Sequence, residues 1–276
     1  MNSVQTSAKQ KVQKEFLVVF TQPLTDSVVR QLLKINANPL FIVLTNSIFG
    51  FLAAYLLASH GNGFLIFISL QLKTLFDNAD GGLARAKPQL TQMGRYFDTG
   101  MDFIVNFFLF IALSFYGPWY LSFLAFVTLM LILSLNFNLE YLYRFERNLL
   151  KPANEHPIGA PLFLYNIFKG LYENILLPQD KILAKLERQR IERLNKQQYT
   201  DISTANKRKW SDHFSTASLV NLGLSSQMLM LGLCALIGKP YYYVYIIFLE
   251  LFYVVALQLY REQKYKKFLS YGEYIA

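Results

Sequence analysis

Long apolar stretches separated by short polar turns run through two parts of the chain, before residue 140 and after residue 216. Each stretch is close to the roughly 20 residues that an α-helix needs to cross the hydrocarbon core of a bilayer. The six stretches cover residues 39–59, 64–85, 96–116, 119–139, 217–237 and 241–260. The pattern therefore predicts an all-α fold, a polytopic membrane protein built as a bundle of six transmembrane helices.

The segment before the first apolar stretch is amphipathic. Residues 16–35 mix apolar and polar side chains. At helical spacing one face collects four aliphatic residues, Val28, Val29, Leu32 and Leu33. Such an N-terminal helix either lies in the membrane interface or packs on the cytoplasmic end of the protein itself, and the sequence leaves both possibilities open.

A long polar segment, residues 141–215, separates the fourth and fifth apolar stretches. Within it, residues 162–177 are apolar, but Lys169 and Glu173 make them a poor transmembrane span, so we expect a re-entrant or surface-lying helix. Residues 181–198 combine aliphatic and charged side chains at helical spacing, which is typical of a soluble amphipathic helix. The segment predicts a cytoplasmic or interfacial helical insertion.

These patterns divide the chain into five parts. We expect an N-terminal cytoplasmic or interfacial segment, four transmembrane helices, the insertion, two further transmembrane helices and a cytoplasmic tail. In that order they cover residues 1–38, 39–140, 141–215, 216–262 and 263–276.

Basic residues are distributed unevenly among the polar segments. The chain has 276 residues, of which 53% are hydrophobic, and a net charge of +9. In a membrane protein this excess is expected to face anionic membrane lipid, with no nucleic acid as partner. Lysine and arginine concentrate before residue 39, between residues 85 and 95, in the insertion and in the tail. The positive-inside rule then predicts both termini on the cytoplasmic side, and we expect a bacterial inner membrane.

Four carboxylates stand where the second and third apolar stretches meet. Asp77 and Asp80 are three residues apart, and Asp98 and Asp102 are four apart. On helices each pair projects from about one face, so two antiparallel helices would aim all four acids into one cleft. Carboxylates near membrane depth are costly, which makes them candidates for a functional site.

Carboxylates that lie this close repel one another unless they bind protons or cations. Hard divalent cations prefer carboxylate oxygen, and a pair of them also bridges phosphate oxygens. The alternative interpretation is a solvated helix end, in which the acids form ion pairs with Arg85, Lys87 and Arg95. The sole cysteine, Cys234, excludes both a disulfide within the chain and a thiolate metal cluster.

The spacing of these acids and their small neighbours resembles the signature of the CDP-alcohol phosphatidyltransferases, D-x-x-D-G-x-x-A-R-x8-G-x3-D-x3-D. All eight positions are matched here, by Asp77, Asp80, Gly81, Ala84, Arg85, Gly94, Asp98 and Asp102. The resemblance implies an integral membrane enzyme of six transmembrane helices, usually a homodimer. It further implies transfer of a phosphate-linked group from a CDP-activated donor to an alcohol, with release of CMP.

The resemblance also implies roles for individual residues. Two divalent cations, Mg2+ or Mn2+, would be the cofactors, and Asp102 would be the catalytic general base. The implied metal ligands are Asp77, Asp80, Asp98 and Asp102. The implied CDP-binding residues are Asp77, Asp80, Gly81, Ala84, Arg85, Gly94 and Asp98.

The donor and the acceptor stay open at this point. The first expectation is CDP-diacylglycerol as donor with a polar alcohol such as glycerol phosphate, serine or inositol phosphate, and the alternative is the reverse. The reverse arrangement donates a CDP-linked headgroup to diacylglycerol and uses the same motif. A phosphorylated acceptor would need basic residues near the cytoplasmic mouth. The candidates by position are Arg144, Arg147, Lys207, Arg208 and Lys209, which are also expected simply as positive-inside anchors.

Two other classes of protein remain as alternatives. A divalent-cation or proton-coupled transporter also places acids among membrane helices. It is expected to place them near the midplane of several spans, whereas the acids of this chain cluster at one cytoplasmic rim. An interaction scaffold would use the basic insertion and would not need the motif.

Overall fold

The computed structural model describes residues 14–86, 92–149 and 162–273. All regular secondary structure in these ranges is helical, which confirms the predicted all-α fold. The α-helices are α1 (Phe16–Lys34), α2 (Pro39–Ala58), α3 (Gly63–Ala86), α4 (Gln92–Leu113), α5 (Trp119–Phe145), α6 (Leu162–Leu171), α7 (Leu177–Asn195), α8 (Thr204–Trp210), α9 (His213–Val220), α10 (Leu224–Leu236) and α11 (Tyr242–Glu273). A short π-helix, η1 (Tyr172–Leu176), joins α6 to α7.

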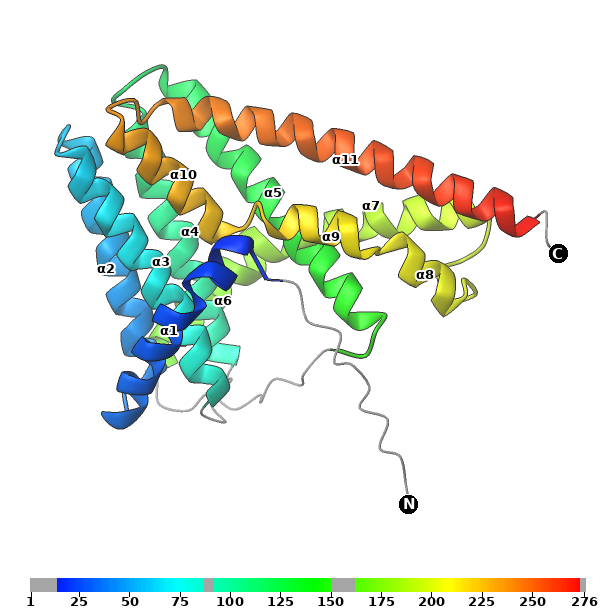
Figure 1. Cartoon of the computed structure of the whole chain (residues 1–276), viewed down its shortest axis with the longest axis horizontal. Helices are drawn as coiled ribbons and strands as arrows, with labels where there is room; N and C mark the ends of the chain where they lie inside the picture. The colour runs from blue at the N-terminus through cyan, green and yellow to red at the C-terminus, as the bar shows by residue number, and fades with distance from the viewer. Residues whose placement is uncertain (1–13, 87–91, 150–161, 274–276) are drawn as a thin grey trace.

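A bundle of α2, α3, α4 and α10 forms the part of the fold that holds the site. Both α3 and α4 pack along α2, and α10 packs on α3 (Figure 1). The start of α2 is set locally, because Asn38 caps it by accepting a hydrogen bond from the Leu40 amide at 3.0 Å and Pro39 occupies its first turn. Small buried residues of α2, including Ala53 and Ala54, let its neighbours approach closely.

In the part of the chain that the structure describes, four helices are long and apolar enough to cross a membrane: α2, residues 96–113 of α4, α5, and residues 242–270 of α11. A fifth is reached if α9 and α10 together count as one span. Helix α3 is not among them, because Lys73, Asp77 and Asp80 interrupt its apolar run. These helices support a multi-pass membrane protein, and the count of six spans stays a prediction.

The predicted fifth span, residues 217–237, is not one straight helix. It is divided between α9 and α10, which meet at a bend of 43°. The residues just before α1 bind at this break: the Glu15 carboxylate accepts a hydrogen bond from the Ser226 amide at 2.9 Å, and Asn221 Oδ1 accepts one from the Phe16 amide at 2.7 Å. A side chain at Gly223 would start only 2.2 Å from Glu15 Oε1. The contact with the N-terminal segment therefore replaces helical hydrogen bonds that a continuous span would make.

Two predicted spans continue as helices well beyond their apolar parts. Helix α5 runs on to Phe145, and α11 runs on to Glu273 (Figure 1). The polar end of α11 packs against the insertion. Ile191 and Trp210 of the insertion and Tyr265 of α11 belong there to a second hydrophobic cluster, apart from the core of the bundle. The described part of the insertion is mainly helical, as predicted, and α7 covers most of the expected amphipathic helix at residues 181–198.

A buried ion pair fixes α11 to α7 in this second cluster. Arg261 is 2% exposed, and its Nη2 donates to Glu187 Oε2 at 2.6 Å. Its Nε donates to the Trp210 carbonyl at 2.9 Å, and its guanidinium lies 4.1 Å from the centre of the Trp210 ring. Arg190 donates to the other oxygen of Glu187 at 2.9 Å. Every charge of this group therefore has a partner, which is what makes a buried ion pair tolerable.

We expect Arg261→Met to lower the free energy of unfolding by roughly 3–5 kcal/mol at neutral pH, because it leaves the buried Glu187 carboxylate without its main partner. Burial raises the pKa of Glu187, but Arg261 and Arg190 outweigh burial and hold that pKa below its ordinary value of 4.5. A carboxylate whose pKa is lowered by folding stabilises the fold at pH values above its ordinary pKa. This stabilisation is lost as the pH falls through the lowered pKa.

Thermal unfolding at neutral pH and at about pH 4 tests this expectation, with the exposed Arg193→Met on α7 as the control. The difference between wild type and Arg261→Met should shrink on acidification. A difference that stays constant over this range would contradict the role of the Glu187 charge.

Candidate active site

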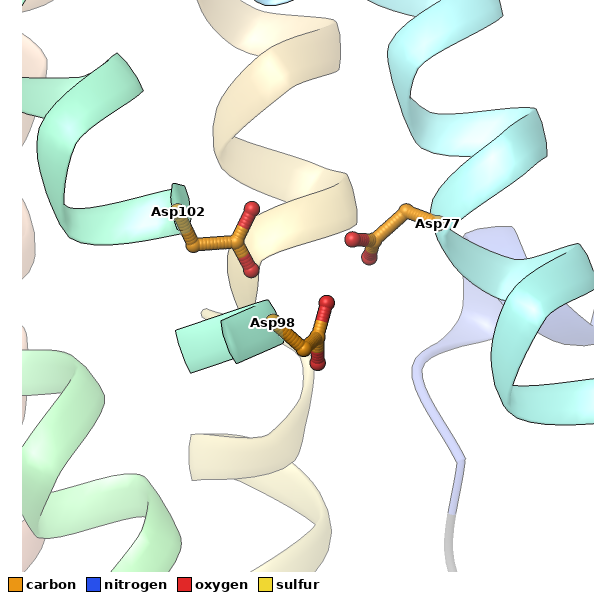
Figure 2. A group of neighbouring side chains, drawn as sticks. All are labelled: Asp77, Asp98 and Asp102. Carbon is orange, nitrogen blue, oxygen red and sulfur yellow. The ribbon is translucent and has the colours of Figure 1, made fainter. Parts of the chain in front are cut away.

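Three carboxylates converge where α3 and α4 face each other. Asp77 comes from α3, whereas Asp98 and Asp102 lie one turn apart on α4. One oxygen from each side chain lies within 4.8 Å of the others, and Figure 2 shows the three groups pointing toward one another. Because α3 and α4 both pack on α2, the acids of separate helices meet at one place. The structure brings together three of the four predicted metal ligands.

Among the described residues, a buried lysine provides the cation nearest to these acids. Lys73 has no exposed surface, and its Nζ lies 2.7 Å from Asp102 Oδ1 and 3.9 Å from Asp77 Oδ1. Asn46 of α2 adds a hydrogen bond from its Nδ2 to Asp77 Oδ1 at 3.1 Å. Sequence reasoning missed both residues. The available signal was Lys73 itself, a charge one turn before Asp77 in an otherwise apolar stretch.

A glycine of α2 leaves space for the side chain of this lysine. A Cβ atom at Gly50 would lie 2.5 Å from Val105 Cγ1 and 3.4 Å from Lys73 Cδ. Only glycine therefore fits at this crossing. The stem of Lys73 lies in the gap and carries its ammonium group to the acids, which is how an apolar helix pair holds a charge at this depth.

Asp80, the fourth predicted metal ligand, lies outside the three-carboxylate group. It is 8% exposed, and its Oδ1 accepts a hydrogen bond from the Gly81 amide. Gly81 and Ala84 follow on α3, and Gly94 lies in the first turn of α4, so the predicted nucleotide contacts flank the acids. The side chain of Arg85 lies outside the described residues. So do the side chains of Lys87 and Arg95, the other predicted ion-pair partners.

The three acids have the chemistry of a divalent-cation site. Carboxylate oxygen is the ligand that Mg2+ and Mn2+ prefer. Asp98 Oδ1 is buried and has no hydrogen-bond partner among the described residues, so its lone pairs are available. The Lys73 ammonium offsets only one of the three negative charges. The donor set of this site fits a divalent ion.

Of the five basic acceptor candidates, Lys209 has its Nζ 5.5 Å from the centre of the Phe268 ring, and the other four fall into two groups. Arg144 forms an ion pair with Glu140 and lines a cavity of about 530 Å³ that Asp102 also lines. The other three stack on aromatic rings or bind backbone carbonyls of the insertion and the end of α5. The partners are the Tyr143 ring at 3.8 Å for Arg147, the Glu146 carbonyl at 2.8 Å for Arg208 and the Tyr199 ring at 4.5 Å for Lys207. These contacts give the three residues a structural role.

The fold and the site together define an integral membrane protein with a carboxylate centre shared by two neighbouring helices. The family model described as CDP-alcohol phosphatidyltransferase matches residues 36–179, slightly more than half of the chain. The chain belongs to this family, which confirms the resemblance seen in the motif. Members are phosphotransferases that use a CDP-alcohol donor and typically a divalent metal. Comparison with curated proteins and with solved structures returned no match.

Proposed function

We propose that the protein transfers a substituted phosphate group from a CDP-activated donor to the hydroxyl of an alcohol, releases CMP, and serves phospholipid synthesis. The convergence of Asp77, Asp98 and Asp102 carries this proposal, because it supplies both ligands for cations on a diphosphate and a base beside them. The active site faces the cytoplasm of a bacterial inner membrane, where soluble nucleotides reach it. The protein acts as a homodimer, as members of the family usually do.

Asp102 is the general base in this proposal. It takes the proton of the acceptor hydroxyl while the new O–P bond forms, and the bond from phosphorus to the CMP oxygen breaks, so that CMP leaves with the electron pair. Lys73 holds the Asp102 carboxylate by the hydrogen bond at 2.7 Å and fixes its orientation. Asp102 also lines the neighbouring cavity, which gives an alcohol access to it.

The acids would hold two divalent ions, Mg2+ or Mn2+. When bound, these ions neutralise the diphosphate and stabilise the CMP leaving group. Asp77, Asp98 and Asp102 are the proposed ligands in the three-carboxylate group, and Asp80 is the proposed ligand outside it. The cytidine diphosphate lies against the backbone at Gly81, Ala84 and Gly94, with Arg85 as a phosphate contact.

The first experiment is CMP release by the purified protein in detergent, with Mg2+ or Mn2+ and with CDP-activated donors and alcohols in all combinations. We expect CMP with at least one combination and none after chelation of the metal. CMP release that persists in a chelator would contradict the metal role. Metal-dependent transport into vesicles without CMP release would favour a transporter instead.

We expect Asp98→Asn to lower the affinity for Mn2+ by about tenfold or more, because it removes a carboxylate whose oxygen has no other partner. Asp80→Asn should lower it less, since Asp80 stands outside the three-carboxylate group and accepts a hydrogen bond from Gly81. Calorimetric titration of the protein with Mn2+ measures both effects. An unchanged affinity in Asp98→Asn would remove this residue from the proposed ligands.

A further inference from the structure

We propose that the cavity beside Asp102 is the acceptor site and that it takes an uncharged alcohol with an apolar body, of the diacylglycerol type. The inference rests on the proposed function and names its substrate class. It implies that the headgroup is carried by the CDP-activated donor.

The cavity lies between α4, α5 and the insertion. Its volume is about 530 Å³, which lies within the usual range of pockets for small-molecule ligands. The apolar residues that line it come from α4, α5, η1 and α10: Phe103, Met130, Leu133, Phe137, Leu176 and Leu224. Such a lining favours a ligand with an apolar body over a small polar alcohol, because the latter would leave this surface uncovered.

The first turn of α7 forms one wall of the cavity. The side chain of Gln179 donates a hydrogen bond to the Met130 carbonyl at 2.7 Å, and Ser134 donates one to the Asp180 carboxylate. Burial raises the pKa of Asp180. These two contacts connect the insertion to α5 at the cavity wall.

The charges on the cavity wall argue against a phosphorylated acceptor. Among the described residues, the lining contains three carboxylates, Asp102, Glu140 and Asp180, and one guanidinium, Arg144. Arg144 is already in an ion pair with Glu140. Lys73 already offsets Asp102, so Asp180 is the one carboxylate of the wall without a cation partner, and no lining cation among the described residues is left unpaired to hold a phosphate group. The remaining predicted basic residues are engaged elsewhere, as described above.

The end of the cavity next to Asp102 provides a hydrogen-bond acceptor for a hydroxyl group. Asn106 lies one turn after Asp102 on α4, is 2% exposed and donates from Nδ2 to the Asp102 carbonyl at 2.8 Å. That bond fixes the orientation of the amide, and its Oδ1 is buried without a hydrogen-bond partner among the described residues. An alcohol hydroxyl that donates to Asn106 Oδ1 is held beside the base before Asp102 takes its proton.

The rim of the cavity is accessible from the membrane. Phe137 and Tyr141 line it, and each side chain is 49% exposed. Both belong to α5, which is long and apolar enough to cross a bilayer. A lipid alcohol that diffuses in the bilayer therefore meets exposed aromatic side chains at the rim of the cavity that Asp102 lines.

The test compares the two directions of transfer with the purified full-length protein in mixed micelles. One arm contains CDP-choline or CDP-ethanolamine with dioctanoylglycerol. The other contains CDP-diacylglycerol with glycerol phosphate, serine or inositol phosphate. We expect CMP in the first arm. CMP in the second arm alone would overturn the assignment of the acceptor and leave the proposed function standing.

Leu133→Trp and Leu131→Trp form a matched pair on α5. Leu133 lines the cavity, whereas Leu131 does not and is 41% exposed on the outer face. We expect Leu133→Trp to raise the KM for dioctanoylglycerol by about tenfold, because the larger ring fills the cavity, with less than about a twofold change in the KM for the CDP donor. Leu131→Trp should change neither. Equal effects of the two variants would overturn the inference.

A photoreactive diacylglycerol supplies a readout that does not depend on turnover. It should label residues of α4 and α5 in wild type, be displaced by dioctanoylglycerol, and label Leu133→Trp much less than Leu131→Trp. This pattern without CMP in either arm would refute the proposed function and support the lipid site. Labelling that is equal in the two variants would refute the site itself.

Discussion

Replacing Asp102 with asparagine should lower turnover by about a thousandfold, because a positioned general base contributes roughly a hundredfold to ten-thousandfold to such reactions. The amide has nearly the same shape as the carboxylate, and its oxygen still accepts the hydrogen bond from Lys73 that spans 2.7 Å in the structure. What the variant loses is the ability to take the proton of the acceptor hydroxyl. Metal-dependent binding of CDP should therefore be largely preserved.

Two measurements on the same preparation separate these effects. The rate of CMP release gives turnover, and calorimetric titration with CDP in the presence of Mg2+ gives binding. Asp201→Asn serves as the control, because Asp201 lies on the exposed surface of the insertion. Normal turnover in Asp102→Asn would exclude it as the base. Loss of CDP binding together with turnover would show instead that its main role is to hold the metal.

The second large effect is expected from Lys73→Met, which keeps the length of the side chain and removes its charge. Lys73 has no exposed surface and contacts two of the three clustered acids. Without it the carboxylates lose their fixed counter-charge, and removal of one partner from a buried ion pair costs roughly 3–5 kcal/mol. A divalent cation bound by the folded state alone should restore much of this loss.

Thermal unfolding in detergent, with a chelator and with excess Mg2+, measures both parts of this expectation. Lys73→Met should unfold at a clearly lower temperature in the chelator, and added Mg2+ should stabilise it more than it stabilises wild type. Lys239→Met is the matched control, since Lys239 is exposed in the turn before α11. An equal response of both variants to Mg2+ would contradict the idea that Lys73 and the metal neutralise the same acids.

The sequence allowed the helical class, the acid motif and the family to be predicted, since all three depend on local spacing. A four-residue interval places Asp98 and Asp102 on one face of any helix, whatever surrounds it. The start of α2 at Pro39 likewise follows from its cap and its first turn. Apolar length also predicted the bundle and six spans, and that count stays a prediction, because the way the charged helix α3 is accommodated and the bend between α9 and α10 depend on the neighbouring segments.

Tertiary structure alone decided which residues meet. Lys73 and Asp102 are 29 residues apart, and Glu187 and Arg261 are 74 apart, so no local pattern links them. The five basic acceptor candidates looked alike in sequence, yet among them only Arg144 lines the cavity next to Asp102. The physical reason is that spacing fixes the face of a helix on which a side chain lies. The packing of one helix on another decides which charged side chains share a buried site and which stay exposed to water or lipid.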